Sequence, residues 1–153
     1  MEKTTATEVE KFLSAPAIAV LGVSNDQKKF GNKVYRAMVA RDLKVYPLNP
    51  KLQSVEGDTC YASLADLPEK VEAAITVIPP RATEKVVSEC AIHGVTTLWM
   101  QPGSESERAI ADAKAHGMRV VHGQCIMMFL EPVTSAHSFH RFFSKLLGSY
   151  PRR

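Results

Sequence analysis

Short stretches rich in apolar residues recur along this chain, and each stops at a glycine, a proline or a polar residue. These stretches cover residues 17–23, 43–48, 73–78, 95–100 and 118–122, with a shorter one at 59–61. A short apolar run without alternation is typical of a strand that is buried on both faces. The pattern therefore predicts six strands, of which the third, at 59–61, is very short.

Helical patterns separate these runs. Val34, Met38 and Arg41 follow one another at spacings of four and three, which is typical of one helix face. A single helical turn is expected at 63–66. A closing helix is expected over 134–147, with several aromatic and aliphatic residues on one face.

Two further helices carry start and stop signals. Pro80 can occupy the first position of a helix, and Gly94 is the expected stop for it. Ser104 and Glu107 have the spacing of a capping box and predict the start of a helix that ends at Gly117.

Strands and helices thus alternate through the chain with short connections. Such alternation predicts an α/β fold: a doubly wound, Rossmann-like parallel sheet in a single domain. Numbered along the chain, the six strands are expected in the order 3-2-1-4-5-6. The expected division is an N-terminal polar and helical segment at 1–14, a binding domain at 15–130, and a C-terminal helix and tail at 131–153 that packs on the domain or on a partner.

Composition and charge exclude several classes of function. The chain has 153 residues and a net charge of +3, and its basic residues form no stripe, so a nucleic-acid surface is not expected. Cys60, Cys90 and Cys125 are far apart and match neither a metal site nor a redox pair. The N-terminus is polar and acidic, unlike a signal peptide, and no apolar run approaches membrane-spanning length. We therefore expect a cytoplasmic protein with no membrane contact.

A doubly wound sheet binds ligands beyond the carboxyl ends of its strands, where the strand order reverses. Each predicted strand end here combines glycine or proline with small polar or basic side chains. These ends are Gly22-Val23-Ser24-Asn25, Asn49-Pro50-Lys51, Ile78-Pro79-Pro80-Arg81, Gln101-Pro102-Gly103-Ser104 and Gly123-Gln124-Cys125.

The first of these loops has the features of a diphosphate site. Gly22 permits a tight turn, Lys28 and Lys29 supply positive charge, and Gly31 permits close approach. The following helix presents free N–H groups to an anion. The dinucleotide fingerprint G-x-G-x-x-G is absent, so a plain strand-to-helix turn with two solvated lysines is the alternative.

The second strand end favours a phosphorylated ribose. NAD-binding folds carry an acidic residue about 20 residues beyond the glycine loop, where it binds the ribose 2′-hydroxyl. Here Lys51 follows Asn49 and Pro50 instead. A lysine at this place prefers a ribose phosphate, as in coenzyme A or NADP.

Together with these loops, the rest of the sequence resembles the CoA-binding-domain family. These are small Rossmann-like proteins similar to the N-terminal domain of the succinyl-CoA synthetase α subunit. The resemblance rests on the order and spacing of several segments. These are residues 19–24, 45–50, 61–68, 99–103 and 125–127, with sequences AVLGVS, VYPLNP, YASLADLP, WMQPG and CIM.

The resemblance implies a role for each segment. Ser24, Asn25, Asp26 and Gln27 would hold the CoA phosphates, although Asp26 is an uncomfortable neighbour for a diphosphate. Lys51 would contact the nucleotide end, and residues 78–80 would pack along the cofactor. With the strand ends above, the expected contacts of CoA or acyl-CoA are Gly22, Ser24, Asn25, Asp26, Gln27, Lys28, Asn49, Pro50, Lys51, Ile78, Pro79, Pro80, Arg81, Gln101, Gly103 and Cys125.

Non-catalytic binding of this cofactor is therefore the expected function. The phosphohistidine of the synthetase lies in a second domain, and no catalytic constellation or metal cluster can be argued from the residues; His137 and His140 lack a carboxylate partner. One alternative is an NAD(P)-dependent oxidoreductase. The other is an interaction module derived from a ligase subunit, which would contact a partner or a second copy through the C-terminal helix. Cys125 would be the nucleophile if a thiol accepted an acyl group.

Overall fold

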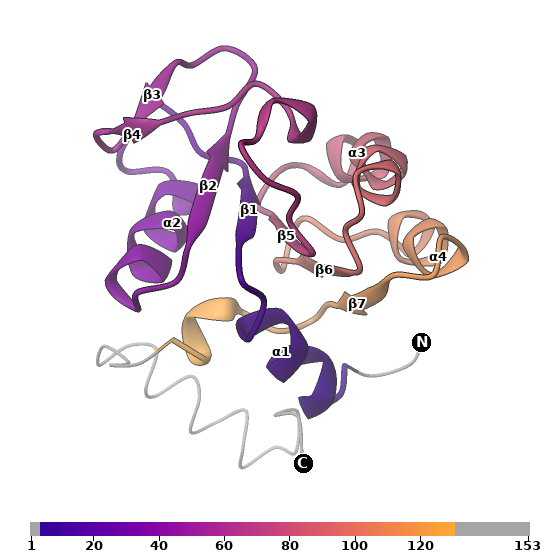
Figure 1. The fold of residues 1–153 in the computed structure, drawn as a ribbon. Coiled ribbons are helices and arrows are strands. Elements are labelled where there is room, and N and C mark those ends of the chain that lie inside the picture. The colour runs from indigo at the N-terminus through magenta and orange to yellow at the C-terminus, as the bar shows by residue number, and fades with distance from the viewer. Residues whose placement is uncertain (1–3, 131–153) are drawn as a thin grey trace.

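The central sheet has five strands in the computed structural model, which describes residues 4–130 (Figure 1). The strands are β1 (Ile18–Leu21), β2 (Val45–Leu48), β5 (Ala73–Thr76), β6 (Thr97–Met100) and β7 (Arg119–Val121). Their order is β2-β1-β5-β6-β7, and every neighbouring pair is parallel. The predicted fold class and the relative order of these five strands are confirmed.

The third predicted strand is reduced to one bridge. Tyr61 pairs with Leu48 in parallel, beside β2 where the order 3-2-1-4-5-6 puts it, but no strand extends from the bridge. Just before it, β3 (Ser54–Val55) and β4 (Asp58–Thr59) form an antiparallel hairpin that the sequence did not predict. Strands of two residues are too short to produce a recognisable period.

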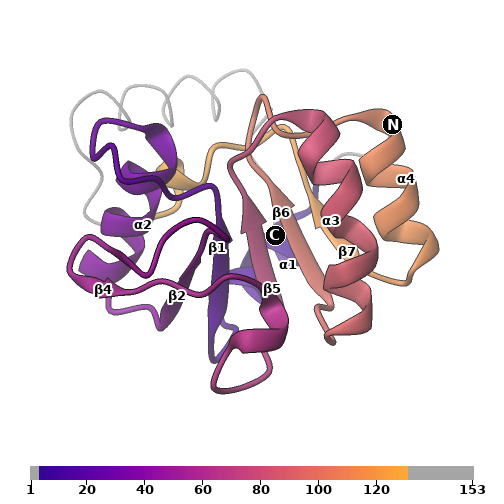
Figure 2. The same ribbon diagram turned by 90° about the horizontal axis from the view of Figure 1, so that it is seen from above.

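Helices cover both faces of the sheet (Figure 2). On one face, α1 (Ala6–Leu13) and α2 (Phe30–Ala40) share a hydrophobic cluster with the sheet. On the other face, α3 (Pro80–Ile92) and α4 (Glu107–Ala115) pack in a second cluster. The short 3₁₀ turns Leu64–Asp66 and Ile126–Met128 complete the described elements. No helix within residues 4–130 is long and apolar enough to cross a bilayer.

Trp99 of β6 is the largest fully buried side chain of the core. Its ring lies edge-on to Phe12 of α1 at 5.0 Å between centroids and to Phe129 at 5.6 Å. Its indole N–H donates to the backbone carbonyl of Gln124 at 3.0 Å. These contacts attach the N-terminal helix and the segment after β7 to the same point of the sheet.

Both ends of α3 and the end of α4, where Gly117 follows the C-cap with φ of 81°, match the sequence signals, whereas the start of α4 does not. Pro80 begins α3, and Gly94 follows its C-cap with φ of 84°. The capping box predicted at Ser104 is wrong: α4 is capped by Ser106, whose hydroxyl accepts from the Ala109 N–H at 3.0 Å. Ser104 is instead buried in a network of hydroxyls.

The closing helix expected over 134–147, with its histidine pair and its aromatic face, lies outside the described residues. The division of the chain at residues 14 and 130 also stays a prediction.

Candidate functional site

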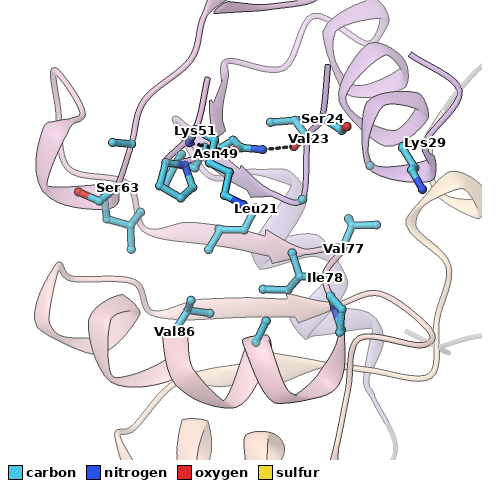
Figure 3. Close-up of a pocket in the computed structure, with 18 of the residues that line it drawn as sticks. Leu21, Val23, Ser24, Lys29, Asn49, Lys51, Ser63, Val77, Ile78 and Val86 are labelled. Atoms are coloured by element: carbon cyan, nitrogen blue, oxygen red, sulfur yellow. Dashed lines mark hydrogen bonds between the residues drawn. The ribbon is translucent and has the colours of Figure 1, made fainter. Parts of the chain in front are cut away.

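A pocket of about 870 Å³ lies at the carboxyl ends of β1, β2 and β5 (Figure 3). The chain leaves β1 toward β2 on one side, whereas β5 lies on the other side of β1, so the strand order reverses here. This is the position at which doubly wound sheets bind ligands. The lining residues are Leu21, Gly22, Val23, Ser24, Lys29, Phe30, Gly31, Leu48, Asn49, Pro50, Lys51, Ala62, Ser63, Leu64, Val77, Ile78, Pro79, Ala82, Val86 and Glu89.

Two glycines allow the backbone to pack closely at the base of the pocket. Gly22 has φ of 126°, and a Cβ there would lie 2.2 Å from the Val77 carbonyl oxygen. A Cβ on Gly31 would lie 2.0 Å from the Gly22 carbonyl oxygen. The first turn of α2 therefore packs directly on the end of β1, which packs directly on the chain that leaves β5.

Asn32, which is fully buried in α2, fixes the loop after β1. Its Oδ1 accepts from the Ser24 N–H at 2.8 Å, and its Nδ2 donates to the Ser24 carbonyl at 2.7 Å. The Ser24 backbone is thus held on both sides by one amide. The Ser24 hydroxyl accepts from the Asp26 N–H at 3.1 Å, which closes the loop into a tight turn.

Asn49 connects the two loops that border the pocket. Its Nδ2 donates to the Val23 carbonyl at 2.9 Å, and its Oδ1 accepts from the Lys51 N–H at 2.8 Å (Figure 3). The side chain predicted to contact a ligand therefore also fixes the loop after β2 relative to the loop after β1.

The pocket has a polar rim and an apolar wall. Lys29 and Lys51 are its two lysines, and Lys29 is also the N-cap of α2, whose positive dipole end therefore borders the cavity. The wall is formed by residues such as Ile78 and Val86, which reach it from the β5 end and from α3 (Figure 3). This combination suits a ligand with anionic groups at one part and an apolar surface at another.

The structure brings seven of the sixteen predicted contacts to the pocket lining: Gly22, Ser24, Asn49, Pro50, Lys51, Ile78 and Pro79. It places the other nine elsewhere: Asn25, Asp26, Gln27, Lys28, Pro80, Arg81, Gln101, Gly103 and Cys125. Whether any of the sixteen binds a ligand stays a prediction.

Several of the nine have structural partners instead. Asp26 accepts from the Lys28 N–H at 3.0 Å, so its carboxylate serves the turn. Gln101 is buried; its Nε2 donates to the Cys125 Sγ at 3.0 Å, and its Oε1 accepts from the Ile126 N–H at 3.1 Å. Arg81 borders a separate hollow between α3 and α4.

Sequence reasoning missed the contribution of α3. Ala82, Val86 and Glu89 line the pocket, and their spacing of four and three places them on one helix face. Val86 directly precedes Val87, which is buried in the core together with Cys90. The signal was present, but an apolar residue beside a core stripe cannot be told from a core residue by spacing alone.

The thiols offer no activated nucleophile at the pocket. Burial raises the pKa of Cys90 to about 12 and also raises the pKa of Cys60, so both stay protonated at neutral pH. Cys125, like the other two, does not line the pocket. Within residues 4–130, no three metal-ligating side chains come together.

Ser104 holds the turn at the β5 end of the pocket. Its buried hydroxyl donates to the Thr76 Oγ1 at 2.8 Å and lies 2.8 Å from the Thr83 Oγ1. Because Ser104→Ala leaves buried hydroxyls without partners, we expect it to lower the free energy of unfolding by about 1–2 kcal/mol. Ser88→Ala, on the exposed side of α3, should change it by less than about 0.5 kcal/mol. An equal loss of unfolding free energy in Ser104→Ala and Ser88→Ala, measured by urea denaturation, would contradict this role of Ser104.

The chain is similar both to segments of much longer proteins and to small proteins along most of their length. The α subunit of the ADP-forming acetate–CoA ligase II from Pyrococcus furiosus is 31% identical over 129 residues. That alignment covers 77% of this chain but 28% of the subunit, so the chain spans little more than a quarter of this relative. The dinucleotide-forming acetyl-coenzyme A synthetase 1 of Ca. Korarchaeum cryptofilum is 31% identical with a TM-score of 0.64, over 73% of this chain and 27% of the synthetase chain.

Small proteins match over nearly their whole length. A conserved hypothetical protein from Pyrococcus furiosus is 34% identical, with a TM-score of 0.70, over 74% of this chain and 97% of its own. The family model described as the CoA binding domain matches residues 16–131, which include every segment that lines the pocket. The chain therefore belongs to the CoA binding domain family.

Proposed function

We propose that the chain binds coenzyme A or an acyl-CoA in the pocket at the β1, β2 and β5 ends, without catalysing a reaction by itself. One observation supports the proposal: Lys51, which follows β2 in a member of this family, lines the pocket at the strand-order reversal, and NAD-binding folds carry an acid after this strand. The names of the larger relatives, which are CoA ligases and synthetases, support the same cofactor.

The chemistry of the pocket matches that of CoA. Lys29, Lys51 and the N-terminus of α2 provide positive potential for the diphosphate and the 3′-phosphate. The apolar wall of Ile78 and Val86 offers a surface for the uncharged part of the cofactor. The volume of about 870 Å³ lies within the range of about 300–1,000 Å³ that is usual for small-molecule sites.

NADP is the rival ligand, because a lysine after β2 also suits a ribose 2′-phosphate. Calorimetric titration of the purified chain separates the two. We expect CoA to bind with saturable heat and NADPH to bind at least about tenfold more weakly, a difference of about 1.4 kcal/mol. Tighter binding of NADPH would overturn the proposal in favour of the oxidoreductase alternative.

The isolated chain is expected to lack acyl-CoA chemistry. The side chains that line the pocket include serines and Glu89 but no histidine or cysteine, and Ser63 donates to Asp66 rather than to a histidine that could activate it. Assays with acyl-CoA, or with acid, CoA and nucleoside triphosphate, should therefore show no turnover above background. Turnover abolished by Cys125→Ser but not by Cys60→Ser would show that the protein is an enzyme.

The contact with a partner or with a second copy, which we predict for the C-terminal helix, falls on residues outside those that the structure describes. It stays a prediction alongside the binding function.

A further inference from the structure

The tip of the β3–β4 hairpin contacts α2 through an acidic side chain. Glu56 occupies the turn in a left-handed conformation, with φ of 53°. Its side chain is only 12% exposed, and its Oε1 accepts from Asn32 Nδ2 at 3.0 Å and from an Arg36 guanidinium nitrogen at 2.7 Å. One carboxylate oxygen thus has two donors from neighbouring turns of the same helix.

Both donors also hold the loop after β1. Asn32 bonds the N–H and the carbonyl of Ser24, at 2.8 and 2.7 Å. Both terminal nitrogens of Arg36 donate to the Gln27 carbonyl, each at 3.1 Å. Glu56 therefore contacts both side chains, Asn32 and Arg36, that fix the beginning and the end of residues 24–27.

Glu56 adds to the contacts that orient the Asn32 amide, since the Ser24 N–H and carbonyl already distinguish its Oδ1 from its Nδ2. An amide turned by 180° would direct its oxygen at both the Glu56 carboxylate and the Ser24 carbonyl and its NH₂ at the Ser24 N–H, and all three contacts would be repulsive. With Glu56 in place, both Nδ2 hydrogens and Oδ1 have partners, as a fully buried amide requires. Without it, one buried N–H loses its acceptor and the amide loses part of what fixes its orientation.

We propose that Glu56 is a positioning residue for the ligand pocket: through Asn32 and Arg36 it holds residues 24–27 in the shape presented to the ligand. Glu56 itself does not line the pocket. As far as the ligand is CoA, the inference rests on the proposed function. It adds that the hairpin, an element outside the pocket, sets how well the pocket binds.

The hairpin provides its own control. Tyr35 of α2 donates to Asp58 of β4 at 2.6 Å, and this bond also joins the hairpin to the helix. Within residues 4–130, neither Tyr35 nor Asp58 hydrogen-bonds to residues 24–27 through its side chain. Tyr35→Phe therefore weakens the attachment of the hairpin and leaves the contacts of Asn32 and Arg36 in place.

Three variants test the inference: Glu56→Ala, Glu56→Gln, which keeps an acceptor oxygen of the same reach, and Tyr35→Phe. The first readout is amide hydrogen exchange of Ser24 in the ligand-free protein. The second is the dissociation constant for CoA. We expect Glu56→Ala to speed exchange and to weaken binding, each by about tenfold or more. Glu56→Gln should restore both to within about threefold of the wild type, and Tyr35→Phe should leave both within about twofold.

Two outcomes would overturn the inference. One is wild-type exchange at Ser24 in Glu56→Ala. The other is an equal effect of Tyr35→Phe and Glu56→Ala on exchange and affinity, which would make Glu56 one support of the hairpin among others. Failure of the wild type to bind CoA would reject the proposed function, while the exchange measurement would still decide whether Glu56 fixes the loop.

Discussion

Replacement of Gly22 by alanine is expected to lower the free energy of unfolding by about 3–5 kcal/mol, the sum of overpacking and backbone strain. The new Cβ would lie 2.2 Å from the Val77 carbonyl oxygen and 2.7 Å from its carbon. Both are backbone atoms, so no change of rotamer can relieve the contact. The φ of 126° adds strain for any residue with a Cβ.

Gly103→Ala is the matched control for Gly22→Ala. Gly103 also has a positive φ, 91°, but a Cβ there would have no atom within 4 Å. Gly103→Ala should therefore lower the free energy of unfolding only by the backbone strain of a left-handed residue, about 1–2 kcal/mol. Chemical denaturation of both variants separates the two effects. If they lose the same stability, the close packing of the strand ends beneath the pocket is not what requires Gly22.

Removal of the Lys51 ammonium group is expected to weaken CoA binding by about 1.5–3 kcal/mol, the usual contribution of a charge-assisted hydrogen bond. Lys51 lines the pocket immediately after Asn49, which fixes its backbone N–H. If its partner is the 3′-phosphate, the wild type should prefer CoA to dephospho-CoA by a similar amount. Lys51→Ala should abolish that preference. Calorimetry with both ligands measures the two effects.

Lys28→Ala removes the same charge from a position that does not line the pocket. It is expected to change CoA affinity by less than about threefold through long-range electrostatics, which salt screens. An equal loss in Lys28→Ala and Lys51→Ala, or an unchanged preference for CoA in Lys51→Ala, would show that no specific contact exists at this lysine.

Much of the fold could be predicted because buried parallel strands leave a strong pattern. The stretches that contain β1, β5 and β6 are rich in apolar residues, and their alternation with helices indicates parallel strands joined by right-handed crossovers. The hairpin at 54–59 could not be predicted, because its stability comes from contacts with α2 such as Tyr35 with Asp58. The start of α4 was misplaced because Ser104 and Ser106 both precede a helical pattern, and tertiary hydrogen bonds decide which of them caps it.

The candidate site could be predicted as an edge of the sheet rather than as a set of side chains. Lys51 and Ile78 line the pocket because strand ends near the reversal point converge. Gln101 and Cys125 also follow strands, but β6 and β7 lie beyond β5, away from the reversal, and these two side chains bond each other. The local turn also matters: Asp26 and Gln27 follow the first strand closely, yet the Asp26 carboxylate accepts from the Lys28 N–H and the Gln27 backbone carbonyl accepts from Arg36.

The most direct test of the account is an NMR titration of the isotope-labelled chain with CoA, in which the backbone amide shifts locate the ligand. Binding of CoA in the pocket predicts saturable shifts at Ser24, Lys51 and Ile78, at the three strand ends that form the pocket, and little change at Ile126. Shifts confined to the hollow of Arg81, Lys85 and Arg108 between α3 and α4, or no saturable shift at any amide, would contradict it.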